Sequence, residues 1–297
     1  MEKIKIAVAG LGNVGQAVCD CVLAAPDMEL RGIVRRKAEG QTRWNNIEIT
    51  EDISSLGHID AAILAGPSRS VGETAEKYLK MGINTVDSFD IHSEIWRHKT
   101  ALDAVAKEYN AVSIVSAGWD PGSDSIIRAL MLAMAPKGIT HTNFGPGMSM
   151  GHTVAVKAVK GVKSALSITV PAGSGRHDRL VYIEAEEGGN REEIAERVKA
   201  DPYFINDDTR VVFTDDVDAL LDMGHGVYMI RKGAAGSVHN QVFEYKMSVN
   251  NPSLTAQIMV SCARASMRRE KGCYTMIELP VIDLLPGTPE QLISKLV

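Results

Sequence analysis

The sequence predicts an α/β protein with a Rossmann-type, doubly wound parallel sheet and a second lobe of the α+β class. Apolar strands and amphipathic helices alternate up to about residue 118, which is typical of parallel sheets. A glycine-rich turn follows the first apolar run, and strands dominate beyond residue 122. The chain of 297 residues is long enough to form two lobes.

The opening segment has the order strand, glycine turn, helix, strand. Residues 4–9 are the first apolar run and residues 28–34 the second. Between them we expect Gly10 to make the tight bend, Gly12 to let a pyrophosphate approach the backbone and Gly15 to allow close packing. This context fits a dinucleotide-binding fingerprint, with the first helical amides facing the phosphates; a purely structural glycine turn is the alternative. The predicted cofactor-binding residues of this segment are Gly10, Gly12, Asn13, Val14 and Gly15.

Two arginines follow the second predicted strand. NAD-binding sites usually have an acidic residue about 20 residues beyond the glycines, where it binds the ribose 2′-hydroxyl. Arg35 and Arg36 occupy that place here, with Lys37 next. Guanidinium groups bind phosphate and cannot accept a hydrogen bond from a hydroxyl, so we expect a preference for NADP. A solvated basic turn is one alternative, and NAD use with Glu39 as the acid is another.

Three further strand ends have polar residues. We expect strands at 61–64, 83–87 and 111–116, besides a short one at 47–49, and helices at 71–80 and 93–109. In open parallel sheets, ligands bind beyond the carboxyl ends of the strands. Ser68 and Arg69 follow the first of the three ends and are predicted to contact the cofactor. Asp90 and Asp120 follow the other two, and together they are predicted to bind a cationic amino group. The alternative is that these segments are only turns.

A second lobe is predicted from about residue 121. A Leu- and Met-rich helix at 125–135 is expected in its core. A glycine-rich loop at 145–152 follows a strand at 139–144 and offers backbone amides to a carboxylate. The remaining elements are strands at 165–170, 180–184 and 209–213, a helix at 191–200, and a long strand whose residues 241, 243, 245, 247 and 249 share one face. This pattern predicts a half-solvated antiparallel sheet that holds the substrate.

The C-terminal segment is expected to return to the first lobe. It contains a predicted helix at 253–268, an apolar strand at 274–282 and a short final helix, which cannot form a domain alone. We therefore predict a dinucleotide-binding domain at 1–120 plus about 253–297, and a substrate-binding and dimerisation domain at 121–252.

Composition excludes several other classes of protein. The net charge of −5 does not favour nucleic acid or an anionic membrane as a partner. No apolar run approaches the length of about 18 residues that a membrane span needs, and the N-terminus does not resemble a signal peptide. The four cysteines have neither metal-site nor disulfide-framework spacing, so we expect no metal, and reduced thiols in the cytoplasm.

Five segments, in order along the chain, resemble the meso-diaminopimelate dehydrogenase family, and the resemblance covers essentially the whole length. They are Val86-Asp87-Ser88-Phe89-Asp90-Ile91-His92, Ser116-Ala117-Gly118-Trp119-Asp120-Pro121-Gly122, Phe144-Gly145-Pro146-Gly147-Met148-Ser149-Met150-Gly151-His152, Asp201-Pro202-Tyr203-Phe204 and Asn251-Pro252. The resemblance implies a homodimeric NADP enzyme that oxidatively deaminates the D-configured carbon of meso-2,6-diaminopimelate. The products would be L-2-amino-6-oxopimelate and ammonia, and the reverse reaction would serve lysine and cell-wall precursor synthesis.

The resemblance also implies roles for individual residues. Asp90, Trp119 and Asp120 match residues around the reacting D-centre, and Met150 and Gly151 match a loop whose amides hold the nearby carboxylate. The residues that match a binding site for the distal L-centre are Thr169, Arg179, His225 and Asn251, with Phe144 as an aromatic wall. Arg179 suits bidentate pairing with a carboxylate. Either aspartate could accept the proton that the amine loses, directly or through water.

One departure from the family concerns a loop. Some members have a long insertion where this chain has only residues 171–178, so it is similar to a shorter-loop subgroup. We expect a more open distal pocket and some activity on other D-amino acids. The rival hypotheses are another Rossmann amino-acid dehydrogenase, a dihydrodipicolinate-reductase-like enzyme, which should have a basic His-Lys cluster that is not found, and an NADP-sensing regulator without catalysis.

Overall fold

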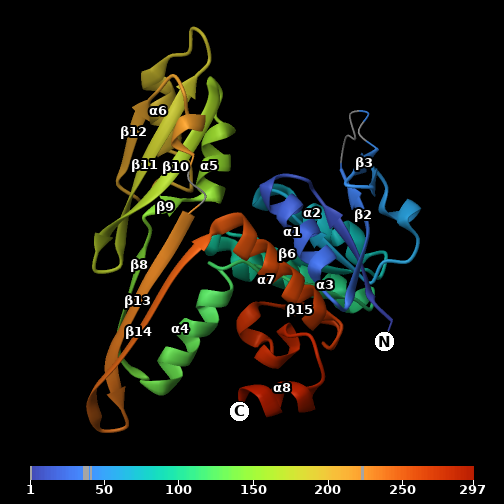
Figure 1. Ribbon diagram of the computed structural model, residues 1–297. Helices are drawn as coiled ribbons and strands as arrows, with labels where there is room; N and C mark the ends of the chain where they lie inside the picture. Colours follow the sequence, from blue (N-terminus) through green and yellow to red (C-terminus); the bar gives the residue numbers. More distant parts are fainter. Residues whose placement is uncertain (1, 36–39, 41, 222–223) are drawn as a thin grey trace. The chain divides into compact units, whose positions relative to one another are not determined.

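The computed structural model describes residues 2–35, 40, 42–221 and 224–297 (Figure 1). The chain forms two compact units. Unit 1 contains the residues up to Ile126 together with Pro252–Val297, and unit 2 is Ile127–Asn251. The first boundary therefore lies inside helix α4 (Ser123–Met134) rather than after residue 120.

Unit 1 contains an eight-stranded sheet in the order β15-β7-β6-β5-β1-β2-β4-β3. Every neighbouring pair is parallel except β3–β4, which confirms the predicted parallel sheet. The strands are β1 Ile4–Ala9, β2 Met28–Val34, β3 Arg43–Trp44, β4 Ile47–Thr50, β5 Ala61–Leu64, β6 Asn84–Asp87, β7 Val112–Ile114 and β15 Gly272–Tyr274. The chain leaves β1 in one direction toward β2 and later resumes on its other side with β5. This is a topological switch point, where ligands bind in such sheets.

Helices cover both faces of this sheet, as a doubly wound fold requires. Side chains alternate along β1, so Ile6 and Val8 join one buried cluster while Ala7 joins another. Val18 packs in the first cluster and Val71 in the second. The helices of unit 1 are α1 Asn13–Ala24, α2 Ser68–Leu79, α3 Ile95–Glu108, α8 Pro289–Leu296 and most of α7 Asn251–Ser266.

The predicted strand at 274–282 is wrong beyond its first residue. Only Gly272–Tyr274 pairs in the sheet, as β15 beside β7. Two 3₁₀ turns follow, η4 (Met276–Glu278) and η5 (Val281–Leu284). A reciprocal capping box between Thr275 and Glu278 stabilises the first turn, and proline at position 280 cannot donate a strand hydrogen bond. Apolar composition alone could not show these local signals.

Unit 2 contains two smaller sheets, β12-β11-β10-β9 and β14-β13-β8. Their strands are β8 Lys137–Phe144, β9 Gly147–Met148, β10 Val162–Gly173, β11 Arg176–Ala185, β12 Thr209–Phe213, β13 Gly224–Ala235 and β14 Val238–Asn250, and the helices are α5 Met150–Lys157 and α6 Arg191–Lys199. The prediction of antiparallel pairing is wrong for β11 and β12, which are parallel. Helix α6 lies in their connection and returns the chain to the end of the sheet where β11 began, which parallel pairing requires.

The connection at 171–178 is mostly strand, not loop. Strands β10 and β11 continue to Gly173 and from Arg176, so only Ser174 and Gly175 form the turn. Both turn residues have positive φ, 53° and 79°, as in the two-residue hairpin turns that match strand twist.

The Leu- and Met-rich helix is not a core helix, contrary to prediction. In α4, Leu130, Leu132 and Met134 are each at least half exposed. The apolar composition predicted an apolar environment, but a surface that meets another molecule has the same composition as one that meets the core. By contrast, β14 alternates as predicted, with its five predicted same-face residues half-buried and their neighbours exposed.

Helices that could cross a bilayer are absent from the described ranges.

Candidate active site

The glycine turn of unit 1 has the predicted geometry at two of its three glycines. Gly10 has a φ of 107°, and its N–H donates to the Val34 carbonyl at 2.9 Å. A Cβ on Gly15 would lie 2.2 Å from the Gly10 carbonyl oxygen, so only glycine allows helix α1 to pack this close to the turn. These contacts confirm the bend and the close packing.

The third glycine faces open space, which suits a pyrophosphate. Apart from the backbone of Gly12, its two chain neighbours and the helix that follows, no heavy atom of the described residues lies within 4 Å of the place where a Cβ on Gly12 would be. Gly12 is also the N-cap of α1, and no side chain in the described chain caps the helix there. The first-turn amides, including those of Asn13 and Val14, therefore have no side-chain cap among the described residues and can bind an anion. This geometry fits a dinucleotide at the switch point beside β1.

Arg35 lies at the carboxyl end of β2. Its N–H donates to the Thr50 carbonyl at 2.9 Å, which ties the position to the end of β4. Arg36, Lys37 and Glu39 lie outside the described residues. Binding of a 2′-phosphate by Arg35 and Arg36 therefore stays a prediction.

Ser68 and Asp90 join two of the predicted strand-end loops. The Ser68 hydroxyl donates to Asp90 Oδ1 at 2.7 Å and accepts from the Asp90 N–H at 3.1 Å. Ser68 opens α2 beyond β5, whereas Asp90 follows β6. The predicted contact of Ser68 with the cofactor stays a prediction, and its described bonds orient the Asp90 carboxylate. Arg69, next on α2, is exposed.

The third loop is a compact turn after β7. The Gly118 N–H donates to the Pro121 carbonyl at 3.0 Å, and the Asp124 N–H donates to the Trp119 carbonyl at 3.0 Å. Trp119 is 6% exposed and Asp120 is half-buried. Because β6 and β7 are parallel neighbours, Asp90 and Asp120 follow strand ends at the same edge of the sheet.

In unit 2 the structure brings predicted substrate-binding residues together around a buried arginine. Thr169 and Arg179 are register partners on β10 and β11, and the arginine is 8% exposed. Its Nε–H donates to Asp207 Oδ2 at 2.6 Å; one terminal nitrogen donates to the Thr169 hydroxyl, and the other to His177 Nε2 at 3.0 Å. A guanidinium has about five N–H donors. Two of them have no partner among the described residues and can pair with a carboxylate.

Sequence reasoning missed Asp207 and His177. His177 and Arg179 are two apart on one strand, so the period of two would have placed them on the same face. Asp207 lies in the connection before β12, and no local pattern relates it to an arginine 28 positions earlier. Two other residues that sequence reasoning missed, Asp87 and His98, belong to unit 1. The only signal for Asp87 in the sequence is that it is a polar residue at the end of an apolar strand.

The pKa values of both histidines near Arg179 are lowered, which favours the neutral form of each ring. Burial lowers the pKa of His225 below its usual value, the charges of Arg179 and His177 add to this, and a backbone contact with Gly226 opposes it. Burial likewise lowers the pKa of His177, helped by Arg179 and opposed by Asp207. A neutral His177 can accept the Arg179 hydrogen bond at Nε2, which a charged one cannot.

Acid should therefore destabilise the protein through these histidines. In the unfolded chain both titrate near 6.5, whereas in the folded chain their pKa values are lower. Below about pH 6.5 the unfolded state binds protons that the folded state does not, so the free energy of unfolding falls as pH falls. Above that pH the contribution is constant. Urea unfolding at several pH values should show a smaller acid loss for His177→Asn than for the parent chain; equal losses would contradict the assignment.

The remaining predicted residues lie at the ends of neighbouring elements of unit 2. The Phe144 ring meets the His177 ring edge-on at 5.9 Å. Asn251 is 5% exposed, and its Nδ2 donates to the Met148 carbonyl at 3.1 Å. Met150 and Gly151 form the first turn of α5, where backbone amides can hold a carboxylate.

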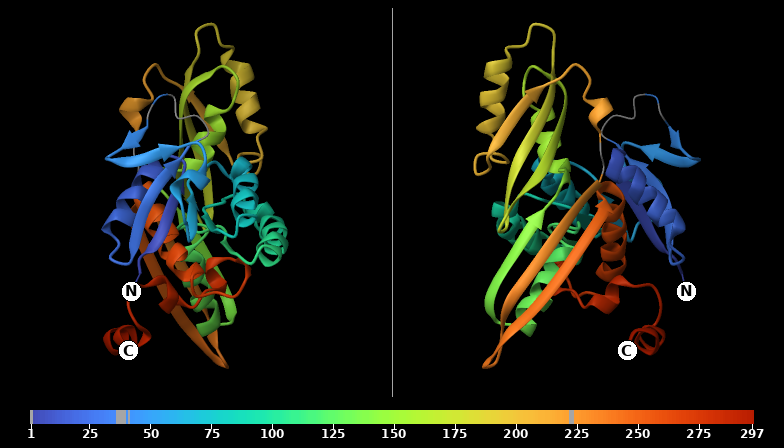
Figure 2. Two further views of the ribbon diagram at one scale, coloured as in Figure 1. Left: turned by 90° about the vertical axis from the view of Figure 1, so that its right-hand side faces the viewer. Right: turned by 60° about the vertical axis from the view of Figure 1, so that its left-hand side comes forward.

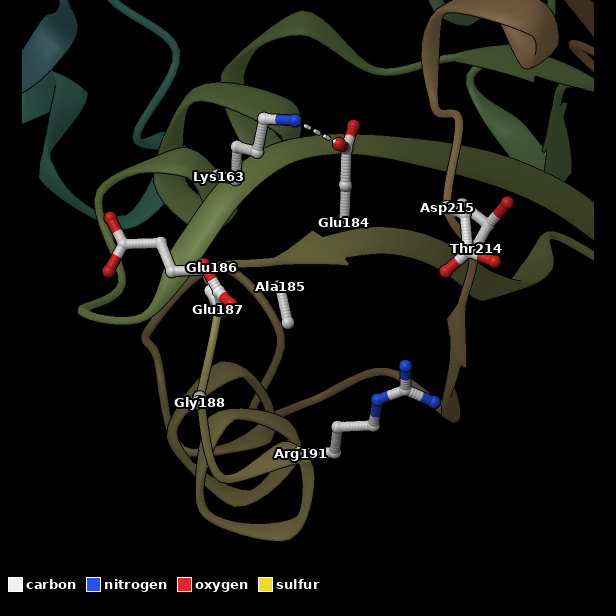
Figure 3. Close-up of a pocket in the computed structure, with 10 residues that line it drawn as sticks. Lys163, Glu184, Ala185, Glu186, Glu187, Gly188, Arg191, Thr214 and Asp215 are labelled. Atoms are coloured by element: carbon white, nitrogen blue, oxygen red, sulfur yellow. Dashed lines mark hydrogen bonds and ion pairs between the residues drawn. The ribbon is translucent and has the colours of Figure 1, made fainter.

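Two hollows of the described surface contain none of the predicted site residues. One, of about 560 Å³, is lined by Lys163, Glu184, Ala185, Glu186, Glu187, Gly188, Gly189, Arg191, Thr214 and Asp215 (Figure 3). Lys163 and Glu184, which both line it, pair at 2.5 Å. Another, of about 400 Å³, is lined by Tyr228, Glu244 and Lys246. No group of three or more metal-binding side chains occurs in the described chain.

Comparisons with known proteins agree on one family. A family model described as diaminopimelic acid dehydrogenase C-terminal domain matches residues 118–175. The meso-diaminopimelate D-dehydrogenase of Bacteroides fragilis is 57% identical over 299 residues, covering 100% of both chains. That of Ureibacillus thermosphaericus is 32% identical over 325 residues, again covering 100% of both.

Solved structures give the same result. DAP dehydrogenase of C. glutamicum in complex with DAP has a TM-score of 0.91 at 29% identity, covering 100% of both chains. An engineered D-amino acid dehydrogenase bound to NADP+ also has a TM-score of 0.91, at 27% identity, covering 99% of this chain and 100% of that one.

Proposed function

This chain belongs to the meso-diaminopimelate D-dehydrogenase family, and we propose that two groups of its residues bind the two amino-acid centres of one substrate. The chain is an NADP-dependent oxidoreductase that converts the D-centre of meso-2,6-diaminopimelate to a ketone, with release of ammonia, and the reaction is reversible. Among the structural observations, the buried Arg179 with two donors left supports a dicarboxylate substrate most directly.

We assign the cofactor to the switch point beside β1. The first-turn amides of α1 and the open space over Gly12 would hold the pyrophosphate, and Arg35 would bind the 2′-phosphate. Arg36 and Arg69 are proposed to assist. When bound, NADP accepts the hydride from the D-configured carbon, which supplies the redox chemistry.

We assign the D-centre to the strand-end loops of unit 1. The substrate ammonium would bind to the carboxylates of Asp90 and Asp120, with the Trp119 ring beside it. As the C–N bond becomes a C=N bond, the amine must lose a proton, and one of the two carboxylates accepts it directly or through water. Ser68 orients Asp90 for this role. The Met150 and Gly151 amides would hold the nearby carboxylate.

We assign the distal L-centre to the residues around Arg179. The guanidinium and the Thr169 hydroxyl would bind the distal carboxylate, and Phe144 would form one wall. Neutral His225 and Asn251 can each both donate and accept hydrogen bonds, which suits a zwitterionic centre.

The test of this function is to follow NADPH absorbance with the meso, LL and DD isomers of diaminopimelate. We expect turnover with the meso isomer and none with the LL isomer, which has no D-centre. Absence of turnover with all three, while NADPH still binds, would favour an NADP-sensing regulator.

The two-residue turn between β10 and β11 supports a broader substrate range. The hairpin leaves no long loop to cover the distal residues. We therefore propose a side activity on other D-amino acids. Turnover of the meso substrate only, even at high concentrations of D-amino acids, would refute it.

We also propose a homodimer in the cytoplasm. Six apolar side chains of unit 2 are about half exposed or more: Leu130, Leu132, Met134, Ile139, Val238 and Val242. A second copy of the chain would cover such a surface. The four cysteines are all free, as in reducing compartments. Sedimentation equilibrium tests the dimer, and a monomeric mass would refute it.

A further inference from the structure

We propose that Asp87 is a positioning residue that fixes the two loops bearing Asp90 and Asp120. The proposal rests on the roles assigned above to those two aspartates. Asp87 is the last residue of β6 and is fully buried, although it is charged. A carboxylate in such a place is costly unless every oxygen has good donors, so its contacts identify its role.

The Asp87 carboxylate bonds to three separate segments. Its Oδ1 accepts from the Phe89 N–H at 3.0 Å and from the Ser116 N–H at 3.2 Å. Its Oδ2 lies 3.1 Å from His98 Nε2 of α3. The main-chain carbonyl of Asp87 also accepts from the Ala117 N–H at 2.8 Å. One residue thus holds the chain just beyond β6 and just beyond β7.

The residues that donate these backbone bonds come just before the proposed active-site residues in the sequence. Phe89 is followed directly by Asp90, and Ala117 lies two residues before Trp119. Ser116 has a φ of 55°, which non-glycine residues rarely adopt. The bond from its N–H to Asp87 stabilises this bend, which turns the chain into the compact loop that presents Asp120.

His98 supports the same arrangement from the adjacent helix. Its ring stacks on Phe89 with the centroids 4.2 Å apart and an angle of 14° between the rings. The side chain of His98 is 10% exposed. The histidine therefore contacts both the carboxylate and the residue before Asp90. Together with the Ser68–Asp90 bonds, these contacts link the loops after β5, β6 and β7.

The proposal predicts a loss of rate rather than a loss of cofactor binding. In Asp87→Leu, which removes the acceptors at similar size, kcat for meso-diaminopimelate should fall about 100-fold, because a small displacement of reacting groups costs that much. Asp87→Asn should lose only about 10-fold, because Oδ1 can still accept both amides while His98 takes the other tautomer. His98→Phe, which keeps the stack on Phe89, should also lose about 10-fold. In all three variants the affinity for NADPH should stay within about threefold of the parent value, because the glycine turn does not depend on the contacts of Asp87.

Thr85→Val is the matched control. Thr85 is fully buried two residues earlier on β6, and its hydroxyl bonds to the Ser113 hydroxyl at 3.0 Å. This variant should lose stability and keep kcat. Unfolding midpoints and circular dichroism give the folded fraction of every variant. If Asp87→Leu does not fold, the kcat values of Asp87→Asn and His98→Phe test the positioning role.

Two results would overturn the positioning role. One is full kcat in the folded Asp87 and His98 variants. The other is a loss of kcat that follows stability equally in these variants and in Thr85→Val. Asp90→Asn and Asp120→Asn are measured alongside: full activity in both refutes the roles of the loop aspartates, whereas lost activity there with full activity in Asp87→Leu refutes only the inference about Asp87.

Discussion

Replacing whichever of Asp90 and Asp120 accepts the proton by asparagine should lower kcat about 10²- to 10⁴-fold, which is the usual contribution of a positioned base. Asparagine keeps the size and the hydrogen-bond acceptor, but it cannot take the proton that leaves the amine. The other aspartate only holds the substrate, so its asparagine variant should mainly raise KM. Steady-state kinetics of Asp90→Asn and Asp120→Asn with meso-diaminopimelate and NADP separate the two.

The pH profile gives an independent criterion. The variant that loses the base should also lose the acidic limb of the kcat profile, whereas the variant that loses only binding keeps it. In Asp90→Asn, the bond from the Ser68 hydroxyl can persist at the remaining oxygen, so the loop should stay in place. If both variants keep kcat within about threefold, neither carboxylate accepts the proton.

The parts of the fold that were predicted depend on local patterns. The glycine turn, its strands and α1 are encoded within the first 35 residues, and Gly10 and Gly15 have the backbone and packing that their spacing indicates. The alternation along β14 likewise depends on neighbouring residues and was predicted correctly. Strand ends at one edge of the sheet follow from parallel topology, which is why Asp90 and Asp120 could be grouped in advance.

The parts that were missed depend on contacts distant in sequence or on the chain's environment. Asp207 reaches Arg179 only because α6 returns the chain so that β12 runs parallel to β11. The exposure of Leu130 on α4 depends on what covers the helix, which an apolar pattern does not specify. The role of Asp87 does not follow from the sequence, because a single acid at a strand end has the pattern of an ordinary turn residue and its hydrogen-bond donors are distant in sequence.

Replacing Arg179 by methionine should lower kcat/KM for meso-diaminopimelate about 10³-fold, equivalent to ~4 kcal/mol for a buried charge-assisted pair. The distal carboxylate would lose its bidentate pairing with the guanidinium, and the Asp207 carboxylate nearby would lose its arginine partner. D-amino acids without a second carboxylate do not pair with this guanidinium, so their kcat/KM should change less than about threefold. The ratio of the two activities, measured by NADPH formation, is the decisive quantity.

Two further variants separate the arginine's own contribution from that of its neighbours. Arg179→Met combined with Asp207→Asn removes the unpaired carboxylate, so any activity it regains over Arg179→Met measures that penalty. Arg179→Lys keeps the charge without the fork and should recover part of the loss, because a lysine cannot bond at once to Asp207, Thr169 and a bidentate carboxylate. If Arg179→Met lowers activity on meso-diaminopimelate and on simple D-amino acids by the same factor, the guanidinium maintains the fold of unit 2 and does not select the dicarboxylate.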